Sequence, residues 1–137
     1  MTLNVQSVPI QYIAQTWPLV EKFIENAAQW GGDDYTLEQV KVYLALGQWI
    51  LLVVIDEQGK IHGAITISFI NYPNDRVAFV TAIGGKFISG KEQYEQFKNV
   101  LKGYGATKIQ GAARESVVRL WRRLGFYERY AIVETKI

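Results

Sequence analysis

The stretch ARESVVRLWRRLGF, residues 113–126, decides how the rest of this chain is interpreted. Apolar residues recur in it at helical spacing, at Val117, Leu120, Trp121 and Leu124. Gly125 follows at the position where a left-handed C-cap ends a helix. The pattern predicts a short amphipathic helix with a basic outer face, which ends at Gly125 and leads into a strand.

The chain after this helix predicts a last strand over residues 130–137. Its residues alternate in character, with Ala131, Val133, Thr135 and Ile137 on one side and Tyr130, Ile132, Glu134 and Lys136 on the other. An alternation with a period of two is typical of a strand that presents different residues to its two faces.

The chain before this helix predicts a strand, two helices, a three-strand meander, a further helix and a short strand. The corresponding residues are 3–10, 12–30, 36–46, 49–56, 61–70, 76–83, 94–104 and 108–112. Thr36 and Gln39 form the pattern of a capping box at the start of the second helix. We therefore expect one α+β domain, residues 1–137, with a mixed, mostly antiparallel sheet in the order β-α-α-β-β-β-α-β-α-β and helices on both faces.

The composition excludes several classes of protein. Hydrophobic residues make up 49% of the 137 residues and charged residues 20%, as in a soluble globular protein. The net charge of +2 does not point to a nucleic acid, and the absence of cysteine excludes disulfides and thiolate chemistry. The longest apolar run, residues 49–55, is too short to span a membrane, and residues 1–10 lack a secretory signal. We expect a cytoplasmic protein that does not bind a membrane.

The order of elements, together with Leu120-Trp121-Arg122-Arg123-Leu124-Gly125-Phe126, resembles the GNAT superfamily of N-acetyltransferases. The glycine pair before Tyr35-Thr36-Leu37-Glu38 and residues 119–126 further resemble small acetyltransferase-like proteins of phages and prophages. The resemblance implies an acetyl-coenzyme A dependent N-acyltransferase that acts on an unknown amine. The alternative is a non-catalytic protein of the same fold, such as a phage virion or host-takeover component that binds a protein partner.

In that superfamily acetyl-coenzyme A lies where the fourth and fifth strands separate, with its pyrophosphate on the amides of the loop before the third helix. By resemblance, the cofactor-binding residues here are Ile83, Gly84, Gly85, Lys86, Ser89, Gly90 and Lys91. Backbone amides at a helix N-terminus suit an anion. The loop lacks the family's Gln or Arg three residues before Gly-x-Gly, so a glycine-rich turn without a ligand stays an alternative.

The resemblance also implies acid–base groups that this chain replaces. The fourth strand has no acidic residue in its interior, Trp121 stands where the family often has a Tyr, and Arg114 stands in place of an Asn. Indole cannot act as a general acid at neutral pH, so the phenols of Tyr127 and Tyr104 are the catalytic candidates by proximity. Catalysis by positioning alone is the other route.

Further polar residues are candidates for binding. Asp33 and Asp34 lie in the loop where the family admits its acceptor and could bind a cationic amine, or could form a solvated loop. Basic residues around the last helix could meet a phosphate or an acidic surface, or form a solvated face: Lys102, Lys108, Arg119, Arg122, Arg123 and Arg129. The single histidine, His62, has no second histidine to share a metal, so we expect no metal site.

Overall fold

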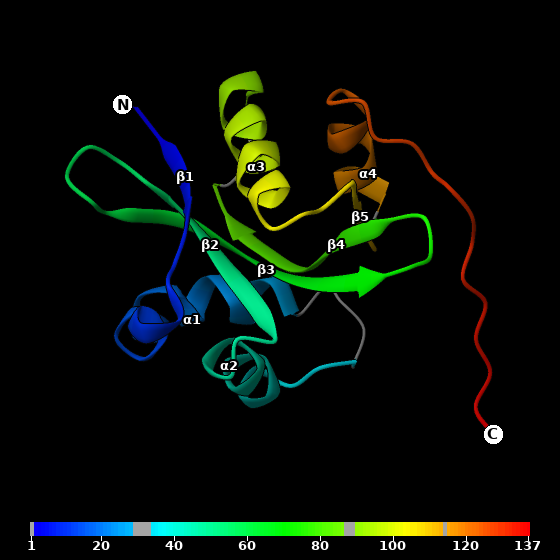
Figure 1. The fold of residues 1–137 in the computed structure, drawn as a ribbon, viewed down its shortest axis with the longest axis horizontal. Helices are drawn as coiled ribbons and strands as arrows, with labels where there is room; N and C mark the ends of the chain where they lie inside the picture. The colour runs from blue at the N-terminus through cyan, green and yellow to red at the C-terminus, as the bar shows by residue number, and fades with distance from the viewer. Residues whose placement is uncertain (1, 29–33, 87–89, 114) are drawn as a thin grey trace.

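The structure, a computed structural model, describes residues 2–28, 34–86, 90–113 and 115–137 (Figure 1). The elements follow in this order: β1 (Asn4–Ser7), the 3-10 turn η1 (Ile10–Tyr12), α1 (Ile13–Ala28), α2 (Leu37–Ala45), β2 (Trp49–Ile55), β3 (Ile61–Asn71), β4 (Arg76–Gly85), α3 (Lys91–Gly103), β5 (Lys108–Gly111) and α4 (Glu115–Arg122). Among the described residues, no helix is long and apolar enough to cross a membrane.

One sheet carries all five described strands, in the spatial order β1-β2-β3-β4-β5. Strands β1 to β4 pair antiparallel, and β5 pairs parallel to β4. A parallel pair needs a crossover connection, which α3 provides between β4 and β5. The predicted α+β fold with a mixed, mostly antiparallel sheet is confirmed.

Helices cover both faces of the sheet. Figure 1 shows α1 and α2 on one face and α3 and α4 on the other. Neighbouring residues of β2 supply the two cores, since Leu51 and Val53 pack with α1 and α2 whereas Leu52 and Val54 pack with α3 and α4. The central strands are therefore apolar on both sides, which explains why β2 is a continuous apolar run.

The predicted capping box of α2 is confirmed. The Gln39 amide donates to the Thr36 hydroxyl oxygen at 3.2 Å, and the Thr36 amide donates to Gln39 Oε1 at 2.9 Å. Both partners lie within one helical turn, so the local sequence is sufficient to position them.

The predicted last strand is wrong in this structure. Residues 126–137 form no helix or strand, and the chain leads away from the sheet after α4 (Figure 1). A strand requires a ladder partner, and alternation of side chains along the chain does not supply one. The α4 prediction also needs one correction, because Leu120 is exposed while Trp121 is the buried residue of the helix.

Strand β4 is longer than expected, because it continues through Gly84 and Gly85 rather than ending before them. Gly84 pairs with Ala64 and Gly85 with Gly63, so the predicted loop begins only after these pairs. This extension determines the geometry of the candidate site.

Candidate functional site

The strands β4 and β5 separate partway along β4. Their pairing runs from Val77 opposite Lys108 to Val80 opposite Gly111, and β4 continues to Gly85. Within the described part of the chain, no strand pairs with β4 on this side beyond Val80. The edge of β4 over residues 81–85 is therefore not paired with a described strand, and we call this unpaired region the β4–β5 opening.

A β-bulge lies at the start of this opening. Val80 pairs with Ile67 and Ala82 pairs with Thr66, which leaves Thr81 as the extra residue of β4. The Thr81 hydroxyl donates to the Thr66 carbonyl at 3.0 Å, and its oxygen lies 2.7 Å from the Thr66 hydroxyl. Bulges increase local twist and redirect a strand, and this one lies where the pairing of β4 with β5 ends.

The backbone of β4 presents amides to the opening. The Lys86 amide donates to the His62 carbonyl at 2.9 Å, which places Lys86 and Gly84 in the hydrogen-bonded pairs with β3. Because successive residues of a strand direct their amides to opposite sides, the amides of Ile83 and Gly85 point away from β3. They face the side on which β5 is no longer present.

Two predicted cofactor residues, Gly84 and Gly85, have a packing reason to be glycine. A Cβ on Gly84 would overlap the backbone carbonyl of Phe23 in α1. Gly85 has a φ of +74°, and a Cβ there would lie 2.5 Å from the His62 carbonyl oxygen. The close approach of α1 therefore explains Gly84, and the positive φ with the nearby β3 backbone explains Gly85, in both cases without a ligand.

The remaining predicted cofactor residues lead from β4 to α3. Lys86 follows β4 and is exposed, Gly90 is the N-cap of α3, and the exposed Lys91 begins that helix. The first amides of a helix have no partner within it and, with the helix dipole, favour an anion. Ser89 lies outside the described residues, as do Phe87 and Arg114.

Trp121 packs where the strands separate, which confirms the expectation that this side chain belongs to the core. Its side chain is 7% exposed and lies at 5.1 Å from the Phe126 ring, centroid to centroid. A Cβ on Gly111 would stand 3.0 Å from Cζ3 and 3.1 Å from Cη2 of the indole. Since Gly111 belongs to the last pair between β4 and β5, the indole closes the inner end of the opening.

The structure does not gather the phenol candidates at the opening. Tyr104 stacks on Phe69 at 5.7 Å, and its carbonyl accepts from Arg76 Nε, at the other end of β4. Tyr127 is 79% exposed in the segment after α4. Asp34 is exposed before α2, and Asp33 lies outside the described residues.

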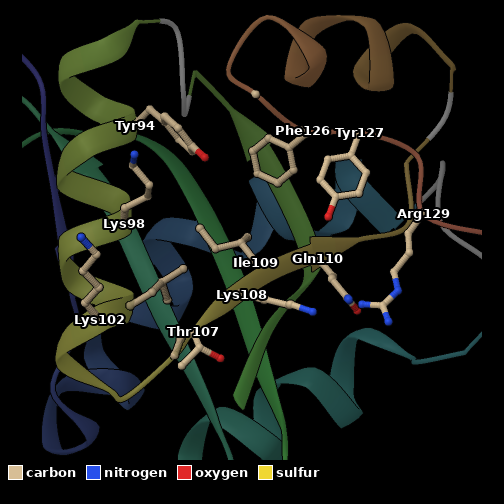
Figure 2. Close-up of a pocket in the computed structure, with 13 residues that line it drawn as sticks. Tyr94, Lys98, Lys102, Thr107, Lys108, Ile109, Gln110, Phe126, Tyr127 and Arg129 are labelled. Atoms are coloured by element: carbon tan, nitrogen blue, oxygen red, sulfur yellow. The ribbon is translucent and has the colours of Figure 1, made fainter. Parts of the chain in front are cut away.

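A pocket of about 310 Å³ lies between α3, β5 and the segment after α4 (Figure 2). Lys98 and Lys102 line it from α3, Lys108 lines it from β5, and Arg129 lies on the side opposite α3. Lys98 pairs with Glu95 at 2.7 Å and Lys108 with Asp75 at 3.0 Å. The predicted basic patch is thus divided, because Arg119, Arg122 and Arg123 are exposed around α4 and do not line the pocket.

A partly buried hydrogen bond between two side chains in the turn from β2 to β3 was not predicted from the sequence. The Asp56 carboxylate accepts from the Gln58 and Lys60 amides and lies 2.8 Å from His62 Nε2. The His62 hydrogen bond, followed by those from the Lys60 and Gln58 amides, lowers the pKa of Asp56. The sequence did offer a signal for this pair, because Asp56 and His62 lie on either side of a turn that contains a glycine. Among the described residues, no group of three or more His, Asp or Glu gathers as a metal site.

No protein-family model matches this chain, and no curated protein matches it. Solved structures do match over nearly the whole length. A predicted acetyltransferase from Clostridium acetobutylicum, with acetyl-CoA, is 15% identical, with 98% of this chain and 96% of that chain covered and a TM-score of 0.66.

Two further structures agree with this match. An aminoglycoside acetyltransferase from an uncultured soil metagenomic sample is 11% identical, with 98% and 95% covered and a TM-score of 0.70. Glucosamine-6-phosphate N-acetyltransferase from Arabidopsis thaliana is 13% identical, with 99% of each chain covered and a TM-score of 0.63. This chain has the fold of the GNAT acetyltransferases.

Proposed function

We propose that this protein is an acetyl-coenzyme A dependent N-acyltransferase that acts on an amine. The observation that carries the proposal is the β4–β5 opening, which begins at the Thr81 bulge and follows β4 to Gly85, with the N-terminus of α3 next in the described chain. The matched structure from Clostridium acetobutylicum, which contains acetyl-CoA, supports the choice of coenzyme.

The described residues fit such a ligand. The amides of Ile83 and Gly85 can pair with the extended, amide-containing arm of the coenzyme as a neighbouring strand would. The amides at the start of α3, with Lys86 and Lys91, suit its phosphates. When bound, the coenzyme supplies an acyl group activated as a thioester.

The chain's own contribution to the reaction is mainly to position the reactants. Strand β4 carries no carboxylate in its interior, so the amine proton passes to solvent or to a group outside β4. We assign the attraction of a cationic amine to the exposed Asp34 before α2, together with Asp33, its neighbour in the sequence. The departing thiolate takes its proton from solvent, because the structure gathers neither Tyr127 nor Tyr104 at the opening.

A non-catalytic protein of the same fold, such as a phage component that binds a protein partner, is the second candidate. Trp121 favours it, because the indole closes the inner end of the opening and has no proton to transfer at neutral pH. Such a protein would keep the fold without turning over a thioester.

Titration calorimetry with acetyl-CoA and with coenzyme A tests binding, and release of free thiol with a panel of amines tests turnover. Lys86→Ala and Lys91→Ala should each weaken binding by about three- to tenfold, on the order of 1 kcal/mol. Lys22→Ala and Lys41→Ala, exposed on the helices of the opposite face, are the matched controls and should leave binding unchanged. No binding at millimolar ligand would refute the acyltransferase proposal, while binding without turnover would favour the second candidate.

A further inference from the structure

His62 is the extra residue of a second β-bulge, at the start of β3. The register between β2 and β3 shifts at Val54 and Ile55, and it skips His62. The His62 carbonyl accepts the Lys86 amide at 2.9 Å, just beyond Gly85, the last residue of β4 in the register with β3. The last bond of a ladder opens more easily than the bonds inside it. The backbone at the end of β4 therefore depends on how firmly His62 is held.

A carboxylate that is itself fixed in the turn holds the His62 side chain. Asp56 Oδ1 accepts from the Gln58 and Lys60 amides at 2.9 and 3.0 Å, and Oδ2 lies 2.8 Å from His62 Nε2. An ionised carboxylate only accepts, so Nε2 carries the proton that it donates. The side chains of His62 and Asp56 are 16% and 7% exposed, so water competes little for this bond. The pair anchors His62 to the turn.

Close backbone contact transmits the position of His62 to the end of β4. A Cβ on Gly63 would stand 2.6 Å from the Lys86 carbonyl oxygen, and one on Gly85 would stand 2.5 Å from the His62 carbonyl oxygen. The two backbones therefore lie closer than side chains would allow. Packing this tight leaves little room for independent movement, so a shift of His62 also shifts Lys86.

The bond between Lys86 and His62 determines which amides face the β4–β5 opening. While the Lys86 amide points to β3, the alternation of the strand directs the Gly85 amide to the opening. If this bond opens, the backbone at Gly85 is free to rotate and the Lys86 side chain loses its fixed origin. Both changes would weaken the binding of a phosphate-containing ligand along this edge.

We propose that His62 and Asp56 are positioning residues for the phosphates of the coenzyme. Their hydrogen bond fixes the His62 carbonyl, which in turn fixes Lys86 and the outward amide of Gly85. The inference rests on the proposed function for the identity of the ligand. Its effect on the backbone is measurable in the protein without ligand.

Amide hydrogen exchange, followed by NMR at neutral pH without ligand, measures opening of the bond between Lys86 and His62. His62→Leu removes the donor to Asp56, so the Lys86 amide should exchange about tenfold faster, because a hydrogen bond to a charged group is lost. His62→Gln keeps an N–H group for Asp56 and should restore slow exchange. Asn71→Ala is the matched control, because it removes the 2.8 Å bond from Arg76 Nη1 at the opposite end of the same hairpin. It should leave exchange at Lys86 unchanged.

Two results of this measurement overturn the proposal. One is an unchanged rate at Lys86 in His62→Leu. The other is a rate that rises equally for the amides of all strands, since this means a loss of overall stability rather than of a local anchor. If His62→Leu does not fold, Asp56→Asn decides in the same assay. It replaces the charged acceptor with a neutral one and should give a local increase at Lys86, and the absence of that increase overturns the proposal.

Titration calorimetry with acetyl-CoA tests the connection to the ligand. His62→Leu should weaken binding by about three- to tenfold, and His62→Gln should bind within about twofold of the unmodified protein. Unchanged affinity in His62→Leu, with faster exchange at Lys86, overturns the positioning role. No binding by the unmodified protein refutes the proposed function instead. In that case exchange at Lys86 alone decides whether His62 positions this backbone.

Discussion

Gly84→Ala tests whether the glycines of the predicted cofactor loop serve packing. Gly84 lies in β4 against the backbone of α1, and an added Cβ would overlap the Phe23 carbonyl oxygen and stand 2.8 Å from its carbonyl carbon. Backbone atoms cannot rotate out of a steric clash as the end of a flexible side chain can, so α1 must move away from the sheet. That movement loosens Val20 and Ile24, which are fully buried in the core beneath.

Overpacking of this kind costs about 1–3 kcal/mol, and contact with backbone places Gly84→Ala in the upper part of that range. With a denaturant dependence of about 2 kcal/mol per molar urea, the unfolding midpoint should fall by about 1 M. Urea unfolding followed by tryptophan fluorescence measures the midpoint. Gly103→Ala is the matched control, since no atom lies within 4 Å of the added Cβ and alanine favours the helix by about 0.5–1 kcal/mol.

The packing argument fails if Gly84→Ala keeps the midpoint of the unmodified protein. If the same variant, still fully stable, lost acetyl-CoA binding, Gly84 would be a ligand contact rather than a packing residue. A destabilised variant that binds acetyl-CoA normally in its folded fraction supports both the packing argument and the proposed function.

Two further predictions concern Asp56 and Trp121. The lowered pKa of Asp56 means that its carboxylate stabilises the fold above about pH 4 and that this contribution is lost as the pH falls lower. Asp56→Asn should therefore lower the urea midpoint at pH 7 and reduce the fall of that midpoint below about pH 4. A fall of the midpoint equal to that of the unmodified protein would contradict this. Asp34→Asn, in an exposed loop, is the control. Trp121→Tyr supplies a phenol at the β4–β5 opening and should raise the rate of thiol release with an amine acceptor. An unchanged rate would contradict the idea that the chain lacks a proton donor for the thiolate at this position. Trp121→Ala should cost about 3–5 kcal/mol of stability, measured by the same urea assay, because it empties the space over Gly111.

The elements that were predicted correctly depend on contacts between near neighbours. Thr36 and Gln39 meet within one turn of α2, and the turns of the meander join strands that are adjacent in the chain. The order of these elements then favoured a crossover from β4 to β5, as observed. The resemblance drawn from residues 120–126 agreed with the fold of the matched acetyltransferases.

The candidate site was only partly predictable. The sequence placed glycines between β4 and α3, but their packing role depends on Phe23, which lies far away in the chain. The bulge at Thr81 likewise arises from its partner Thr66 on β3, and the Asp56–His62 pair from the closing of a hairpin. None of these contacts has a periodic signal in the sequence.

Residues 130–137 separate what the local sequence determines from what only the tertiary structure decides. The sequence by itself determined the order of helices and strands from β1 to α4, because periodicity and capping act over a few residues. Only the tertiary structure decided that β4 parts from β5 beyond Val80, that Trp121 closes the opening and that the last segment leaves its own sheet. Strand pairing joins residues distant in the chain, so an alternating pattern can specify a strand without specifying its partner.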